Sequence, residues 1–155
     1  MKFNVAEMGH VVNLIPPIDI TGGKTGDVFS MRDYSHATII VQIGVSAAAF
    51  TKIILEECTD FTGAGAAALP FNFYKEETSA DDTLSVREVV PAAGYTPSAV
   101  DNIFYVIELD AAELSEGKQF VQLRLTNGAN SVIASAIAIL SGSRYAGDQS
   151  PTAIA

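Results

Sequence analysis

Residues 22–25, with the sequence GGKT, are the strongest hint of chemistry because they match the end of a phosphate-binding loop. Such a loop needs a further glycine five residues before the second glycine of this run, and Ile18 stands at that position. It also needs a buried strand before it and a helix after it, whereas Pro16 and Pro17 precede it and an extended run follows. We therefore interpret the segment as a turn whose lysine is solvated.

Cys58 is the only cysteine, and with His10 or His36 it would make a nucleophile and a base. A single cysteine at the end of an apolar run is more typical of a small buried side chain, and no flanking sequence of a thiol enzyme surrounds it. Two histidines and one cysteine at unrelated spacings also make no structural zinc site. We predict that the chain has no catalytic, cofactor-binding or metal-binding residues.

The carboxylates indicate structure more than catalysis. Glu56 and Glu57 are adjacent in an extended run and so point to opposite faces of a strand. Residues 81–82, both aspartates, lie in an acidic loop without the spacing of a calcium-binding helix–loop–helix motif. Glu108 and Arg124 are predicted to form a cross-strand ion pair. The sequence therefore predicts a protein that is not an enzyme.

Composition limits the partners. The chain has 155 residues, enough for one domain, and only 17% are charged, against about 25% in an average soluble domain. So little charge predicts that part of the apolar surface faces another chain. A net charge of −9 argues against nucleic acid, and the longest apolar run is far below the ~20 residues that cross a membrane. The N-terminus does not resemble a secretory signal, which predicts synthesis in the cytoplasm.

Apolar residues recur with period two, which is typical of half-buried strands. The expected strands cover residues 37–46, 50–58, 71–74, 84–90, 102–110, 119–125 and 132–140. We predict that the first two, 37–46 and 50–58, are sequential antiparallel neighbours. The run 132–140 is apolar on both faces, as in a central strand covered on two sides. Asn127 and Gly128 predict a hairpin turn, and Asp110 with Glu113 predicts a capped helical turn.

This pattern predicts an all-β chain, a β-sandwich or jelly roll with an extended N-terminal arm. We expect residues 1–35 to form the arm and an edge segment, residues 36–145 the sandwich, and residues 146–155 a flexible tail. Adjacent prolines keep the arm extended and remove ladder donors, so its apolar residues lie either on this chain's own sheet or on a neighbour's. The residues expected to contact a partner are Val11, Val12, Leu14, Ile15, Pro16, Pro17 and Ile18.

Several phrases together resemble small structural proteins encoded among the virion genes of tailed bacteriophages. They are GDVFSM (26–31), YSHATII (34–40), GVSAA (44–48), DNIFYVIE (101–108), LRLTN (123–127) and SVIASA (131–136). The resemblance spans roughly Val11 to Tyr145. It implies a capsid decoration, or cement, protein, which is a β-rich, non-catalytic subunit that binds the outside of an expanded icosahedral shell and clamps neighbouring major capsid subunits.

Under this resemblance the partners are the major capsid protein and further copies of the chain, with a homotrimer favoured, and the location is the outer capsid surface of the virion. We expect trimer contacts on apolar faces within 37–58 and 132–140, and contacts of residues 11–20 with the shell or the next subunit. Two alternatives remain. One is a tail or head-fibre subunit that binds a host glycan, which should show a groove of exposed aromatic side chains in place of a flat apolar base. The other is a single jelly-roll coat subunit.

Overall fold

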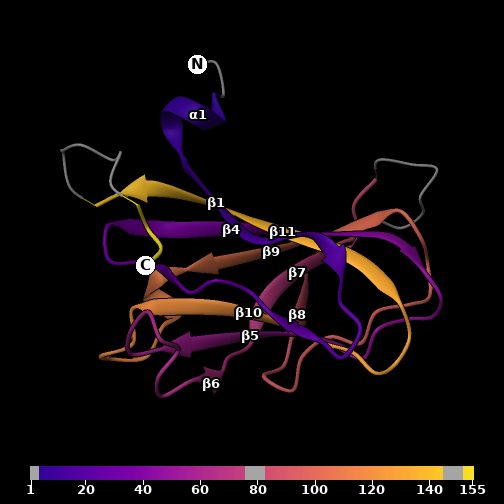
Figure 1. Ribbon diagram of the computed structural model, residues 1–155. Helices are drawn as coiled ribbons and strands as arrows, with labels where there is room; N and C mark the ends of the chain where they lie inside the picture. Colours follow the sequence, from indigo (N-terminus) through magenta and orange to yellow (C-terminus); the bar gives the residue numbers. More distant parts are fainter. Residues whose placement is uncertain (1–3, 76–82, 145–151) are drawn as a thin grey trace.

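The computed structural model describes residues 4–75, 83–144 and 152–155, and within these ranges two antiparallel sheets pack face to face (Figure 1). The large sheet contains, in spatial order, β1 (His10–Asp19), β11 (Val132–Ser143), β4 (Tyr34–Ser46), β9 (Ile103–Asp110), β7 (Phe71–Lys75) and β8 (Glu88–Val90). The small sheet contains β2 (Lys24–Thr25), β10 (Phe120–Thr126), β5 (Lys52–Cys58) and β6 (Ala67–Ala68), and β3 (Phe29–Ser30) also pairs with β10. The predicted all-β sandwich is confirmed.

Two short helical segments complete the described chain. The α-helix α1 (Val5–Met8) precedes β1, and the 3-10 helix η1 (Ala111–Glu113) follows β9. The predicted cap of the second segment is confirmed, because the backbone N–H of Asp110 donates to Glu113 Oε2 at 2.9 Å. No helix in the described ranges is long and apolar enough to cross a membrane.

The core lies between the sheets and follows the period-two pattern. Every second side chain of β9, of β10 and of residues 37–43 in β4 points inward and is at most 3% exposed, among them Ile39, Ile107 and Leu123 at 0%. Their neighbours along each strand point out of the sandwich. Burial of so many aliphatic and aromatic side chains, at about 25 cal/mol per Å² of apolar surface removed from water, supplies the main driving force for this fold.

The N-terminal segment forms the edge strand of the large sheet. β1 pairs with β11 from His10 to Asp19, and its register shifts between Asn13 and Ile15 and again between Ile15 and Ile18. The second shift spans the two prolines, which have no N–H to give to the ladder. Of the two alternatives for its apolar residues, the structure shows burial on this chain's own sheet for Val12, Leu14 and Ile15, while Val11 is 52% exposed.

Strand pairing differs from the expectation at two connections. β4 and β5 are not neighbours, because one belongs to the large sheet and the other to the small sheet. β10 and β11 are likewise in different sheets, so the hairpin predicted at Asn127 and Gly128 is wrong. The Asn127 side chain instead donates to the carbonyl oxygens of Ile20 and Asn130, and it fixes a crossover between the sheets. The predicted strand 84–90 is a strand only over β8.

The last residues of the chain lie against the small sheet. Ala153 is 6% exposed, its carbonyl oxygen accepts a hydrogen bond from the backbone N–H of Ser30 at 2.8 Å, and Ile154 forms a bridge with Phe29. Residues 152–155, which the sequence placed in a flexible tail, are thus packed against β3. The rest of the predicted tail after residue 144, and most of the acidic loop with residues 81–82, lie outside the described residues.

Candidate functional site

The outer face of the large sheet, the side that points away from the small sheet, is the candidate site. The strand register aligns its side chains in rows: Val11 opposite Ile139, then Thr38, then Glu108. The next row runs from Asn13 through Ile137 and Ile40 to Val106. We use "outer face" for the following set: Val11, Asn13, Thr38, Ile40, Gln42, Phe104, Val106, Glu108, Ile133, Ser135, Ile137 and Ile139.

Most residues of this face are apolar although it points outward. Val11 is 52% exposed, Ile133 39% and Ile137 37%, while Ile40 and Val106 are half-buried. The expectation that β11 is covered on both sides is therefore wrong within this chain, since only its inward side chains are buried. An antiparallel sheet with one solvated face normally carries polar residues there, whereas seven of the twelve outer-face residues are apolar, namely Val11, Ile40, Phe104, Val106, Ile133, Ile137 and Ile139.

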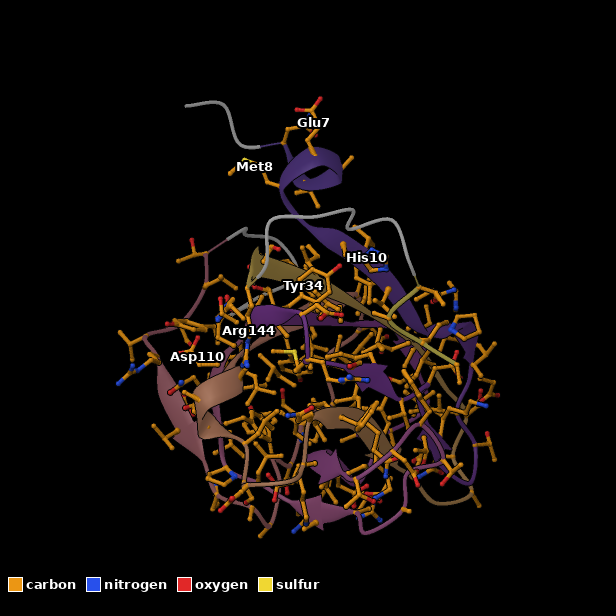
Figure 2. All side chains as sticks on the ribbon, turned by 90° about the vertical axis from the view of Figure 1, so that its left-hand side faces the viewer. Glu7, Met8, His10, Tyr34, Asp110 and Arg144 are labelled. Carbon is orange, nitrogen blue, oxygen red and sulfur yellow. The ribbon has the colours of Figure 1, made fainter. Side chains whose placement is uncertain are left out.

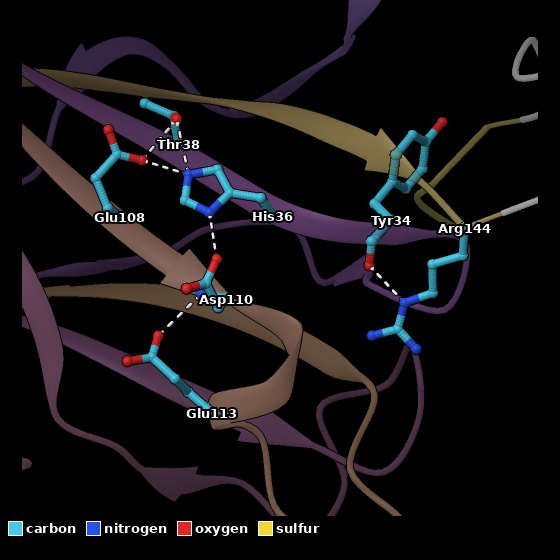
Figure 3. Close-up of polar contacts among 7 residues, drawn as sticks. All are labelled: Tyr34, His36, Thr38, Glu108, Asp110, Glu113 and Arg144. Atoms are coloured by element: carbon cyan, nitrogen blue, oxygen red, sulfur yellow. Dashed lines mark hydrogen bonds and ion pairs between the residues drawn. The ribbon is translucent and has the colours of Figure 1, made fainter.

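A histidine with two carboxylate partners closes one end of the outer face (Figure 3). His36 Nε2 lies 2.7 Å from Glu108 Oε2, and His36 Nδ1 lies 2.7 Å from Asp110 Oδ1. The Thr38 hydroxyl also donates to Glu108 Oε2 at 2.7 Å. A carboxylate can only accept, so both ring nitrogens must carry hydrogen for the two contacts to be hydrogen bonds. This geometry selects the positively charged imidazolium.

The protonation of His36 follows from these contacts. Burial disfavours the charged ring, but the hydrogen bonds to Asp110 and Glu108 outweigh it, and the pKa of His36 is raised above its usual value. Glu108 is thus paired with His36, and the predicted ion pair between Glu108 and Arg124 is wrong. Arg124 lies in the other sheet, where its guanidinium donates to Glu56 Oε1 at 3.0 and 2.6 Å.

The helix α1 stands over one end of the outer face (Figures 1 and 2). Between α1 and the sheet runs a groove of about 550 Å³, lined by Val5 and Met8 of the helix and by Ile139, Thr38 and Glu108 of the sheet. No residue of α1 is buried, and Met8 is 47% exposed. A four-residue helix is not stable through its own backbone hydrogen bonds, so α1 has more apolar surface than this chain covers.

The residues suspected of chemistry are not brought together. Cys58 is fully buried on β5 of the small sheet, and burial raises the pKa of its thiol, whereas His36 lies on β4 of the large sheet. His10 lies with its ring 6.0 Å from that of Tyr34. Within the described residues, no group of three or more histidine, cysteine or acidic side chains could hold a metal ion.

The GGKT run is a turn that leads into β2, as predicted. The backbone N–H of Gly22 donates to the carbonyl oxygen of Gly128, and that of Gly23 donates to Ile20, both at 2.8 Å. Lys24 pairs with Leu125 of β10, so a strand and not a helix follows the glycines. Because the amide groups that would cradle a phosphate already have partners, the run lacks the geometry of a nucleotide-binding loop.

The two adjacent glutamates have separate structural roles. Glu56 lies on the outward side of β5 and binds Arg124 and Gln122. Glu57 accepts a hydrogen bond from the Ser115 backbone at 2.8 Å and lies 3.4 Å from Lys118 Nζ. Burial raises the pKa of Glu57, but these two partners outweigh it, and the net shift is downward.

The structure divides the predicted partner-contact residues into two groups. Val12, Leu14 and Ile15 are at most 4% exposed and pack in this chain's own core. The members of the set that remain accessible are Val11, Pro16, Pro17 and Ile18. Within the predicted contact ranges 37–58 and 132–140, the accessible side chains lie mainly on β4 and β11, which each have an outward side. β5 is almost entirely buried.

No family model matches this chain, and no curated protein matches it. Among solved structures, the crystal structure of the SPBc2 prophage-derived protein YomS is similar, with a TM-score of 0.46 and 15% sequence identity. The match covers 85% of this chain and 95% of that chain.

Proposed function

We propose that this chain is a non-catalytic structural protein of a bacteriophage virion that binds the outer surface of the capsid and stabilises contacts between major capsid subunits. The sequence resemblance supplies the class of protein. The observation that carries the proposal is the apolar outer face of the large sheet, where Val11, Ile133 and Ile137 are at least 37% exposed. Such a face serves a protein whose function is to be covered by neighbours.

The outer face suits assembly better than glycan binding. A glycan-binding subunit would present a groove of exposed aromatic rings, whereas the groove under α1 is lined by Val5, Met8 and Ile139. Phe61, the aromatic residue among the exposed large hydrophobic side chains, is 37% exposed and packs against Phe120 with ring centroids 4.7 Å apart. Its ring is therefore part of a local aromatic contact on the small sheet.

A second accessible region lies at the edge of the large sheet. Pro16 and Pro17 are exposed on β1 and Ile18 is half-buried. In this proposal they contact the major capsid protein, and the chain assembles as a homotrimer. Each contact is small, but many copies on one lattice bind together with an effective concentration that raises the total affinity.

The test is to add purified protein to capsids that lack it and to image the particles by electron cryo-microscopy. Deletion of residues 1–20 is unsuitable, because Leu14, Ile15 and Ile20 belong to the core. We use instead Ile18→Asp at the edge, with Thr25→Asp on the exposed strand β2 as the matched control. The proposal expects repeated density on the outer shell that is lost with Ile18→Asp alone. Density confined to the tail would contradict it and favour the adhesion alternative.

A further inference from the structure

We propose that a second copy of this chain covers the outer face and fills the groove under α1. The inference rests on the proposed function in treating the outer face as an assembly surface, and it names the partner that occupies it. Three features of the described residues support a copy of the same chain: the size of the face, the distribution of charge, and the construction of the sheet edges.

The outer face is large enough for a stable subunit contact. β11 and β4 have 12 and 13 residues, and β1 and β9 have 10 and 8. The twelve residues of the outer face and the five further residues that line the groove, Val5, Met8, Gly9, Ser141 and Gly142, make seventeen, which approaches the about 20 residues that each partner contributes to a standard interface. The contact is continuous with the groove, because Ile139, Thr38 and Glu108 belong to both.

Charge favours contact between identical copies at this face. The chain carries a net charge of −9, so two copies repel each other over most of their surface. β11 contains no charged residue and β4 contains only His36. The carboxylates of Glu108 and Asp110 on β9 are both bonded to that histidine, and Asp19 at the far end of β1 is bonded to Thr21 and Ser131. The outer face is thus where a second acidic chain meets the least repulsion.

The sheet edges do not offer a second copy a better position. At one edge β1 contains Pro16 and Pro17, which cannot donate to an added strand, and its register shifts interrupt the ladder. At the other edge β8 has three residues. A subunit that cannot extend the sheet has to pack on its face, where the apolar side chains are.

The second copy also accounts for α1. The helix projects beyond the sandwich, and its Glu7 points away from the sheets (Figure 2). None of its four residues is fully buried by its own chain, and apolar side chains from a neighbour that enter the groove would contact Val5, Met8 and Ile139 together. The helix then gains the tertiary packing on which short helices depend.

The experiment measures the mass of the purified full chain by sedimentation, at protein concentrations from about 1 to about 100 μM. The samples are the wild type, Ile137→Glu and Thr25→Glu. The monomer is 16.3 kDa. We expect a multiple of this mass for the wild type and for Thr25→Glu, and a monomer for Ile137→Glu. An unpaired charge in an apolar contact should weaken self-association by about 100-fold or more. Circular dichroism checks the fold, and Val11→Glu, at a more exposed position of the same face, replaces Ile137→Glu should the latter not fold.

A monomeric wild type, or an oligomer that Ile137→Glu and Val11→Glu leave intact, overturns the inference. Its failure is distinguishable from failure of the proposed function through the capsid-binding assay. A monomer that still decorates capsids contradicts the second copy and leaves the decoration function standing. An oligomer that Ile137→Glu dissociates, but that binds no capsid, supports the second copy and contradicts the decoration function.

Discussion

The two sheets of this sandwich differ in the exposure of their outward side chains. On the small sheet, Ile54, Glu56 and Cys58 of β5 point outward, yet they are at most 9% exposed. On the large sheet, Ile133 and Ile137 of β11 point outward and are 39% and 37% exposed. The chain covers the first surface with its own loops and a polar network, and it leaves the second apolar. In our proposal, the first surface serves the folding of the monomer and the second its assembly.

The loops over the small sheet lie very close to it. Gly94 has a φ of +85°, and a Cβ at this position would lie 2.6 Å from the carbonyl oxygen of Ile53 and 2.8 Å from Ile54 Cγ1. The neighbouring residue Tyr95 forms a bridge with Ile53. Only glycine both adopts this φ without strain and leaves room for β5. The covered state of the small sheet therefore depends on a few close approaches of this kind.

The largest effect is expected when this cover is disturbed. Gly94→Ala should lower the free energy of unfolding by about 3 kcal/mol, because the strain of positive φ adds to a clash with the backbone of β5. Gly117→Ala is the matched control, since Gly117 has a φ of +79° but nothing within 4 Å of the added Cβ. It should cost about 1 kcal/mol. Urea unfolding measures both, and equal losses would show that the loop does not press on β5.

A second pair of variants should separate folding from assembly. Glu56→Ala removes the acceptor of Arg124 and of Gln122, whose amide donates at 2.7 Å, and should lower the free energy of unfolding by about 2 kcal/mol without changing the oligomer mass. Ile137→Ser should do the reverse, lowering the mass while the monomer stays within about 0.5 kcal/mol of the wild type. Urea unfolding and sedimentation of the same samples make the test. The proposed difference between the two sheets is contradicted if both variants change the free energy of unfolding, or if both change the oligomer mass.

Sequence patterns predicted the positions of the strands along the chain better than the pairing between strands. Period-two alternation is a local property and identified β4, β9 and β10, and the spacing of Asp110 and Glu113 is equally local and identified the capped turn. Which sheet a strand joins depends on contacts far along the chain, and the pairing of β4 with β5 and the hairpin at Asn127 were wrong for that reason. The partner of Arg124, Glu56, was missed because finding it requires knowing that β5 and β10 belong to the same sheet.

The candidate site was predicted in part for a related reason. The run 132–140 was correctly found to be apolar on both sides, but a sequence does not tell whether an apolar side chain is covered by its own chain or by another. Val12, Leu14 and Ile15 show the converse case, since the sequence placed them among the partner-contact residues and their side chains are buried in this chain's own core. The cluster of His36, Glu108 and Asp110 needed the register of β4 and β9, which the alternation alone does not supply.

The smallest effect concerns pH and the end of the outer face. His36 holds two carboxylates, and its pKa is raised in the folded state. A group with a raised folded pKa contributes stability that is full below its unfolded pKa, near 6.5, and is lost as the pH rises through the folded value. The urea midpoint of the wild type should therefore fall from pH 6 towards pH 9. The fall should be modest, because the imidazole is 32% exposed and water screens its charge.

His36→Gln tests this assignment, since glutamine keeps a hydrogen-bond donor but has no titrating group. The variant should lose the decline of the midpoint above pH 6, and Glu108→Gln and Asp110→Asn should each reduce it, because each removes one of the two charges that favour the imidazolium. Losing the positive charge of His36 also leaves two carboxylates unbalanced on the outer face. Self-association should then weaken over the same pH range, a change that Glu56→Ala, on the small sheet, should leave intact. An unchanged pH profile in His36→Gln would place the titrating group elsewhere in the chain.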